Sequence, residues 1–210
     1  MGTVFCDISV SADGFAAGAN QSEEAPLGEI EENVLHRWMF ETYDENSEEV
    51  DAIVDSGATI MGRNMFGPVR GEWDRDWRGW WGSEPPYHGP VFVLTHFARQ
   101  PIEMQGGTTF FFVTDGIQSA LDAARAAAGE RNISVAGGAS TVNQFLAAGL
   151  LDELRLHVSP CVLGTGERVF DGVPAQALER VSVRAASLVT HITYRPVRPE
   201  ASSATGYRAV

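Results

Sequence analysis

The sequence predicts a single three-layer α/β domain around a mixed, mostly parallel central sheet. Short apolar runs alternate with segments of helical periodicity up to about residue 160, and such alternation places helices on both faces of a parallel sheet. Residues 178–185 and 188–197 alternate like an antiparallel hairpin. No linker or internal repeat divides the chain, so we expect one domain over residues 1–197 and a flexible tail over 198–210.

The first elements are a strand and two helices. Residues 4–10 read as a strand, and the turn pair Asp13-Gly14 follows it. Apolar residues recur at helical spacing over residues 29–43, which predicts an amphipathic helix, and a second helix is expected over 48–56.

A long irregular segment separates the next two strands. Residues 58–61 and 90–95 read as short buried strands, and residues 67–89 between them are rich in Trp, Gly and Pro. A loop of this length inside a compact domain is usually functional. Its tryptophans, within residues 73–81, could form a lid over a substrate or could simply anchor the loop.

Strands and helices continue to alternate in the second half of the chain. Two stretches have helical spacing: the Ala-rich residues 117–128 and the residues before Gly149. The other segments are apolar or alternate with period two, as strands do. We expect strands over 108–113, 133–136 and 153–159, and helices over 117–128 and 140–148.

The composition excludes several reaction classes. All fifteen basic residues are Arg, and the absence of Lys removes the P-loop, Schiff-base and class A β-lactamase mechanisms. The formal net charge is −13. Such an acidic chain is a poor partner for nucleic acid, because phosphate binding relies on clusters of Lys and Arg.

The remaining composition fits a cytoplasmic protein. Cys6 and Cys161 are far apart in the sequence, which favours reduced thiols over a disulfide framework. The five His residues show no ligand spacing with each other or with either Cys, so we expect no metal site. No apolar run approaches the roughly 18 residues of a membrane span.

One strand-to-helix junction is suited to anion binding. A buried strand passes through paired glycines directly into a helix, whose free N–H groups and positive dipole end favour a phosphate. The glycines could equally serve only a tight turn. The junction consists of Val135, Ala136, Gly137, Gly138, Ala139, Ser140 and Thr141.

Two further strand ends each supply an arginine. Either arginine alone could lie on the surface with no ligand. Because ligands collect at the carboxyl ends of parallel strands, the three strand ends together predict a dinucleotide-phosphate site. The residues are Gly62, Arg63 and Asn64 after one strand, and Thr95, His96 and Arg99 after the next.

Asp13 and Trp38 are candidates for the substrate side. Asp13 follows the first strand, where its carboxylate could donate or relay a proton, although Asp-Gly is also a common turn pair. Trp38 is expected either in the core or in the wall of the substrate pocket.

Together these motifs resemble the dihydrofolate reductase-like superfamily, in particular its RibD C-terminal branch, the reductase of riboflavin biosynthesis. They occur in the family's order over about residues 3–195. The matching segments are Ser11-Ala12-Asp13-Gly14, Met61-Gly62-Arg63, Val93-Leu94-Thr95, Ala136-Gly137-Gly138-Ala139, Leu151-Asp152-Glu153-Leu154 and the following Pro160-Cys161-Val162-Leu163-Gly164-Thr165-Gly166.

The resemblance implies the dihydrofolate reductase-like fold, with NADPH bound across the carboxyl edge of the sheet. It implies that Gly62, Arg63 and Asn64 meet the phosphates. Thr95, His96 and Arg99 would surround the 2′-phosphate of the adenosine, and residues 135–141 would face the pyrophosphate and the nicotinamide.

The resemblance also places the substrate side. The Asp13-Gly14 turn and the Leu163-Gly164 region would border the site of hydride transfer. Dihydrofolate reductases place a carboxylate on the first helix to serve the pterin. Here that segment offers Glu31, Glu32 and Glu41, and no motif selects among them.

The expected function is an NADPH-dependent reductase acting on a small heterocyclic or carbonyl-like substrate, for which a pterin or pyrimidine is one type. A non-catalytic nucleotide- or small-ligand-binding protein on the same fold is the alternative, and an adaptor that uses the tryptophans at 73–81 is a third. The hairpin would leave a strand edge open to a second copy. The sequence leaves the oligomeric state undecided.

Overall fold

The computed structural model describes residues 2–197, and the expected tail at 198–210 lies outside the described residues. One large sheet contains β1 (Val4–Ser11), β3 (Ala58–Gly62), β4 (Pro90–Leu94), β5 (Ile102–Glu103), β6 (Thr109–Val113), β7 (Ile133–Gly137), β8 (Glu153–Ser159), β10 (Leu178–Ala186) and β11 (Val189–Pro196). Its order is β10-β11-β8-β1-β7-β3-β4-β6-β5. A separate two-stranded sheet pairs β2 (Phe15–Ala17) with β9 (Glu167–Arg168).

The central strands confirm the expected topology. From β8 through β1, β7, β3 and β4 to β6, neighbouring strands run parallel. The hairpin of β10 and β11 is antiparallel and joins the sheet through an antiparallel pairing with β8. The sheet is therefore mixed and mostly parallel.

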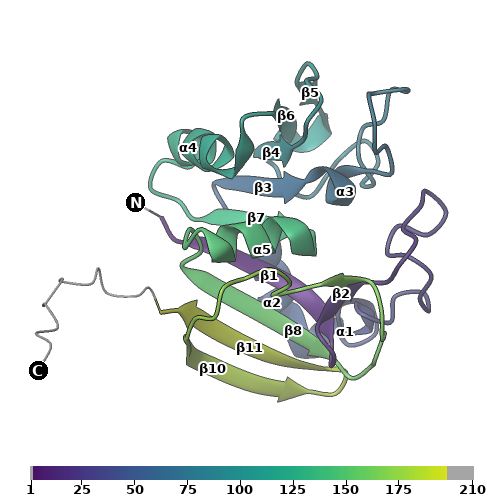
Figure 1. Ribbon diagram of the computed structural model, residues 1–210, viewed down its shortest axis with the longest axis vertical. Helices are drawn as coiled ribbons and strands as arrows, with labels where there is room; N and C mark the ends of the chain where they lie inside the picture. Colours follow the sequence, from purple (N-terminus) through teal and green to yellow (C-terminus); the bar gives the residue numbers. More distant parts are fainter. Residues whose placement is uncertain (1, 198–210) are drawn as a thin grey trace, which may run out of the picture.

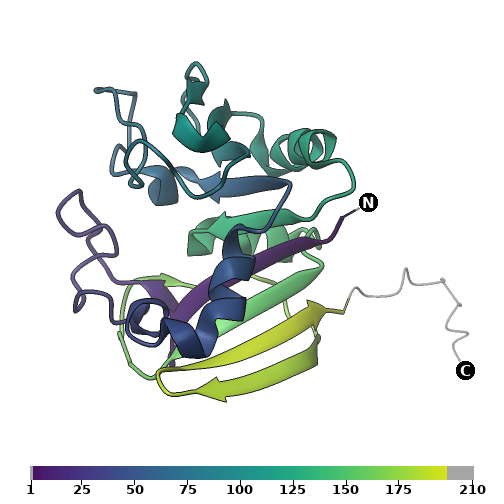
Figure 2. The same cartoon turned by 180° about the vertical axis from the view of Figure 1, so that it is seen from behind.

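Helices cover both faces of the sheet. The helices are α1 (Arg37–Phe40), α2 (Tyr43–Val54), α3 (Arg63–Phe66), α4 (Gly116–Ala128) and α5 (Ala139–Ala147), with a short 3₁₀ turn at Gln105–Gly107. Helices α4 and α5 lie on the face seen in Figure 1. Helices α1 and α2 lie on the opposite face, which Figure 2 brings to the front. Within residues 2–197, no helix combines the length and apolar character needed to cross a membrane.

Each face of the sheet has its own apolar core. Cys6, Ile8 and Val10 of β1 belong to the cluster that also contains Leu121 of α4 and Phe145 of α5. A second cluster gathers Met61, Phe66, Val91, Val93, Ile102 and Phe110, and the tryptophans of the long irregular segment pack against it. Alternation along the strands divides the apolar residues between the two faces.

The helix expected over residues 29–43 is wrong for most of its length. Residues 29–36 form turns, and only Arg37–Phe40 is helical before α2 begins at Tyr43. Asn33 has φ of +57°, a left-handed conformation that a right-handed helix cannot contain. The apolar spacing reflects burial of Leu35 and Trp38 from a looping chain.

The pairing of β1 with β7 is short. These strands are paired only at Val4 with Ile133 and at Phe5 with Ser134. On its other side, β1 pairs with β8 continuously from Phe5 to Ser11. The two halves of the sheet are therefore joined near the amino ends of β1 and β7, and they have no ladder between them toward the carboxyl ends.

Candidate cofactor site

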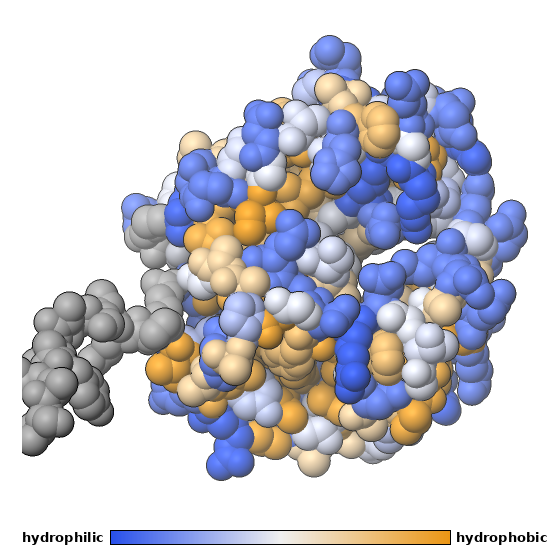
Figure 3. Space-filling model, viewed as in Figure 1, coloured by the Kyte–Doolittle hydropathy of each residue, from blue (hydrophilic) through white to orange (hydrophobic). Residues whose placement is uncertain are grey.

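The predicted phosphate-binding segments meet at one edge of the sheet. Gly62 at the end of β3 pairs with Leu94 of β4, and Met61 pairs with Gly137 of β7. A Cβ atom on Gly62 would collide with Oγ1 of Thr141, so the end of β3 lies directly against α5. Figure 3 shows a hollow on the side of the molecule where these strand ends and the neighbouring loops lie.

Arg63 has hydrogen-bonding groups that the protein does not satisfy. The residue is 9% exposed, and its Nη1 donates to Oγ1 of Thr95 at 3.1 Å. Its Nε and Nη2 atoms are buried and have no hydrogen-bond partner among the described residues. A buried cation with unpaired donors is costly unless an anion completes it, so Arg63 has hydrogen-bonding capacity that the protein itself does not use.

Other cations surround Arg63. Burial lowers the pKa of Arg63, and the nearby charges of Arg70 and Arg99 lower it further. Arg70 donates from Nη1 to the carbonyl oxygen of Gly67 at 2.7 Å, which holds it near the end of α3. Asp74 is the acidic neighbour that acts in the opposite sense and raises the pKa of Arg63, and three arginines gather here on a chain whose net charge is −13.

Arg99 differs from Arg63 because the protein already satisfies it. Its Nη1 donates to the carbonyl oxygen of Trp77 at 2.6 Å, and its Nη2 donates to Oδ1 of Asp76 at 2.8 Å. Both guanidinium groups lie over the Trp73 ring, Arg63 at 3.8 Å from the ring centroid and Arg99 at 4.8 Å. The Trp73 ring therefore packs against both guanidinium groups, a contact that the sequence alone did not indicate.

The tryptophan segment is anchored to the sheet. The indole N–H of Trp73 donates to the carbonyl oxygen of Phe97 at 3.0 Å, and that of Trp77 donates to Phe66 at 2.9 Å. Trp81 stacks on Phe110, with the ring centroids 6.1 Å apart. These contacts favour the anchoring interpretation over an adaptor surface.

The glycine junction opens α5 toward the same edge. Gly137 has φ of +121°, a conformation that residues with a Cβ rarely adopt. The carbonyl oxygen of Gly138 accepts from the backbone N–H groups of Thr141 at 3.0 Å and Val142 at 3.2 Å. The positive end of the α5 dipole therefore points to the strand ends.

The remaining predicted cofactor residues differ in their exposure to solvent. Val135, Ala139 and Thr141 are buried, and Ala136 is half-buried. Asn64, His96 and Ser140 are exposed. Of the predicted cofactor residues, Ser140 alone lines a cavity of about 430 Å³ between α5 and β9 with its flanking residues.

Asp13 fastens a loop. Its Oδ1 accepts from the Ser11 hydroxyl at 2.6 Å and from the backbone N–H of Leu163 at 3.1 Å, while its Oδ2 accepts from Gly164 at 2.7 Å. These hydrogen bonds, led by that from Ser11, lower its pKa to about 2. The carboxylate is ionised at neutral pH, and it positions the Leu163-Gly164 loop beside Gly14. Its catalytic role stays a prediction.

Trp38 does not face a substrate pocket. It is fully buried, and its indole N–H donates to Ser9 Oγ at 3.1 Å. Its ring packs on His157 and His191, with centroid distances of 4.7 and 5.1 Å. Of the two expected positions for Trp38, the core is therefore the one observed, and the expected substrate contact is not.

The carboxylates expected on a first helix also lie outside the interior. Glu31, Glu32 and Glu41 are all exposed. Glu41 pairs with Arg37 at 2.8 Å, and this partner lowers its pKa. The structure therefore selects none of the three as a buried acid.

Comparison with known proteins gives a family match and one curated relative. A family model described as the RibD C-terminal domain matches residues 2–192. YyaP, an uncharacterised protein of Bacillus subtilis strain 168, is 26% identical over 205 residues, which make up 91% of this chain and 93% of YyaP.

Solved structures share the architecture. A protein assigned to riboflavin biosynthesis from Shewanella sp. PV-4 matches with a TM-score of 0.63 and 23% identity, covering 93% of this chain and 99% of that one. A pyrimidine reductase-like protein from Corynebacterium diphtheriae gives a TM-score of 0.56 and 12% identity, covering 94% and 93% of the two chains.

A Thermotoga maritima diaminohydroxyphosphoribosylaminopyrimidine deaminase/5-amino-6-(5-phosphoribosylamino)uracil reductase gives a TM-score of 0.55 and 14% identity. The match covers 93% of this chain and 57% of that chain. At these identities the likeness establishes the fold.

Proposed function

Because the chain belongs to the RibD C-terminal domain family, we propose that it is an NADPH-dependent reductase of a small heterocyclic substrate. The Thermotoga neighbour is named as a reductase of a phosphoribosylaminouracil, so an aminopyrimidine is the substrate class to test first. Both cysteines are free thiols, which supports a cytoplasmic location.

The observation that carries this proposal is the incomplete hydrogen bonding of Arg63. Its free Nε and Nη2 groups match the planar, forked geometry with which a guanidinium binds a phosphate. A 2′-phosphate on these donors would favour NADPH over NADH. Arg99, with both Nη atoms already engaged, would support this site through its contact with Trp73.

The other residues would hold the dinucleotide and the substrate in place. The backbone between Gly137 and Thr141 would face the pyrophosphate at the start of α5, and Gly62 allows close approach there. When bound, the cofactor supplies the hydride. The loop fastened by Asp13 would border the reacting carbon, and because Asp13 is ionised, water is the better proton source.

Direct binding tests the assignment of Arg63. We expect the wild-type protein to bind NADPH more tightly than NADH in a titration followed by nicotinamide fluorescence. Arg63→Gln removes charge-assisted hydrogen bonds worth about 1.5–3 kcal/mol, so the affinity for NADPH should fall roughly 10- to 100-fold. The affinity for NADH should change little.

Arg99→Gln is the matched control, and it should affect NADPH binding less than Arg63→Gln does. A folded Arg63→Gln variant that keeps the preference for NADPH would contradict the assignment. Turnover of NADPH with pyrimidine, dihydrofolate and quinone substrates distinguishes a reductase from a binding protein on the same fold. Binding without turnover across that panel would favour the latter.

A further inference from the structure

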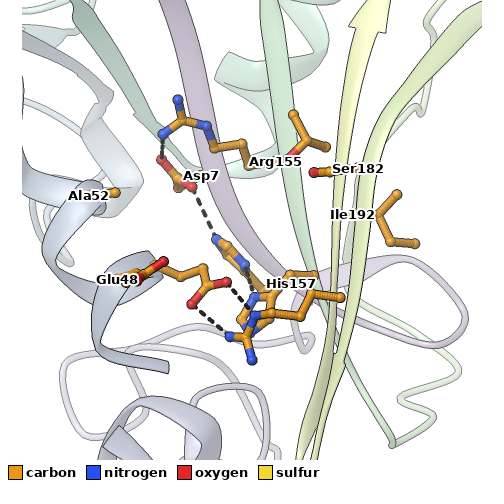
Figure 4. Close-up of a pocket in the computed structure, with 11 residues that line it drawn as sticks. Asp7, Glu48, Ala52, Arg155, His157, Ser182 and Ile192 are labelled. Atoms are coloured by element: carbon orange, nitrogen blue, oxygen red, sulfur yellow. Dashed lines mark hydrogen bonds and ion pairs between the residues drawn. The ribbon is translucent and has the colours of Figure 1, made fainter. Parts of the chain in front are cut away.

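A buried pair of histidines lies on the α2 face of the sheet, in strands β8 and β11. Nδ1 of His157 and Nδ1 of His191 are 2.7 Å apart, a hydrogen-bond distance. The two residues are 2% and 6% exposed. Figure 4 shows this region beside a cavity of about 290 Å³ between α2 and the strands.

The outer nitrogen of His157 faces a carboxylate. Its Nε2 lies 3.1 Å from Oδ1 of Asp7, and Oδ2 of Asp7 accepts from Nη1 of Arg155 at 3.3 Å. Asp7 forms an ion pair with Arg155, and a carboxylate in an ion pair can only accept hydrogen bonds. Nε2 of His157 must therefore carry a hydrogen.

The outer nitrogen of His191 faces an amide oxygen. Nδ2 of Asn46 donates to the carbonyl oxygens of Thr42 at 2.8 Å and Trp38 at 3.2 Å. Oδ1 of Asn46 accepts from Nη2 of Arg184 at 2.9 Å. If the amide were flipped, Oδ1 would face the two carbonyl oxygens and Nδ2 would face the guanidinium of Arg184. Oδ1 therefore faces Nε2 of His191 at 2.9 Å, and this nitrogen also carries a hydrogen.

These assignments leave one proton to be placed. If both rings were neutral, each would already have its single hydrogen on Nε2, and two bare Nδ1 lone pairs would face each other at 2.7 Å. We propose that His157 and His191 share one additional proton, forming a buried imidazolium–imidazole pair whose charge is balanced by Asp7. The pair thus holds three hydrogens on four ring nitrogens.

The surrounding groups oppose a second proton. Burial, followed by the charge of His157, lowers the pKa of His191 to about 4. The same two causes lower the pKa of the neighbouring His36 to about 4. Of the charged residues that line the cavity, Asp7 of β1 and Glu48 and Glu49 of α2 are acidic, and Arg155 of β8 and Arg184 of β10 are basic. Arg184 is paired with Glu49 at 2.6 Å.

The shared proton joins β8 to β11, and Nε2 of His191 extends the network to Asn46 of α2. Asn46, which receives the hydrogen bond of His191, is a non-helical residue inside α2 with φ of −127° and ψ of 15°. Trp38 of α1 packs on both imidazole rings. A second proton would set two imidazolium rings against each other, so the pair forms an acid-sensitive contact between β8 and β11, on which the α1–α2 segment packs.

Nitrogen-15 NMR of the histidine side chains tests the proton count. At pH 7 we expect hydrogen on Nε2 of both His157 and His191 and one far-downfield proton coupled to their Nδ1 atoms. That resonance should vanish in His157→Gln and in His191→Gln and persist in the control His88→Gln, whose side chain is exposed. A chelator should leave it unchanged.

The uptake of a second proton at low pH is followed in the wild-type protein, so this test does not depend on how the variants fold. The Trp38 indole N–H signal, assigned with Trp38→Phe, should shift in the same step near pH 4 in which the downfield proton disappears. Two neutral rings at pH 7, a protonated Asp7 carboxyl, or a resonance removed by the chelator would each overturn the proposal.

Discussion

At the scale of single residues, the same side-chain type has different roles according to its partners. Arg63 and Arg99 lie on one indole ring. Arg99 is satisfied by Asp76 and a backbone carbonyl, whereas Arg63 keeps two buried donors free. The sequence places both arginines at strand ends, but it does not indicate which of them the long loop will neutralise, because that depends on how residues 67–89 fold back.

Asp13 provides a second prediction at this scale. Asp13→Asn should loosen the loop that carries Leu163 and Gly164, because a neutral amide is a weaker acceptor than a carboxylate. Amide hydrogen exchange at these two residues should become faster. Asp171→Asn, at an exposed aspartate in the segment after β9, is the matched control; equal exchange in the wild-type protein and Asp13→Asn would show that the carboxylate does not hold the loop.

At the scale of elements, the contact between β3 and α5 depends on a missing side chain. Gly62→Ala places a Cβ against Oγ1 of Thr141 and should lower the free energy of unfolding by about 1–3 kcal/mol through overpacking. Adding Thr141→Ala removes the obstructing oxygen and should restore much of the loss.

Urea denaturation of the two single variants and the double variant measures this coupling. Gly71→Ala, with nothing within 4 Å of the added Cβ, is the control and should change stability little. Additive effects in the double variant would show that the collision is not the cause.

Strand β10 carries a prediction about association. It is an outer strand of the sheet, and Val181 and Val183 on it are 46% and 51% exposed. Because unpaired edges favour strand pairing, we expect a homodimer through β10, with Val183→Lys shifting it to monomer in analytical ultracentrifugation.

Val162→Lys places the same charge at an exposed valine in the loop after β8 and should leave that dimer intact. A monomeric wild-type protein, or a Val183→Lys variant that stays dimeric, would contradict the interface.

The elements also show where sequence reasoning works. Strands β3, β4, β7 and β8 and helices α4 and α5 follow from local apolar patterns, because each buries a regular face. Residues 29–36 have the same kind of pattern without the helix, since Asn33 turns the chain and the apolar side chains reach the core separately. The short strands β2, β5 and β9 depend on partners far away in the sequence and leave no local signal.

At the scale of the whole molecule, buried histidines make stability depend on pH. His36 and His191 have pKa values lowered from 6.5 to about 4. Between these values the unfolded chain binds more protons than the native one, so the stability that these two lowered pKa values contribute falls as the pH falls from about 6.5 toward 4. Each such proton contributes up to about 1.4 kcal/mol per pH unit.

Urea denaturation at pH 7, 6 and 5 measures this slope. His36→Gln should flatten it, and His88→Gln should not. Asp13 acts in a separate window, because its pKa is lowered from 3.8 to about 2 and its contribution is lost only below about pH 3.8. Stability that stays constant between pH 7 and 5 would exclude the effect of the histidines.

The short pairing of β1 with β7 also has a mechanical consequence. The sheet consists of two plates, β10-β11-β8-β1 and β7-β3-β4-β6-β5, joined at Val4 and Phe5. Because no ladder crosses this seam toward the carboxyl ends, we expect one plate to bend against the other most easily here, with the largest displacement at the carboxyl edge. A dinucleotide that spans both plates would brace them, so the seam makes the stiffness of the molecule depend on what it binds.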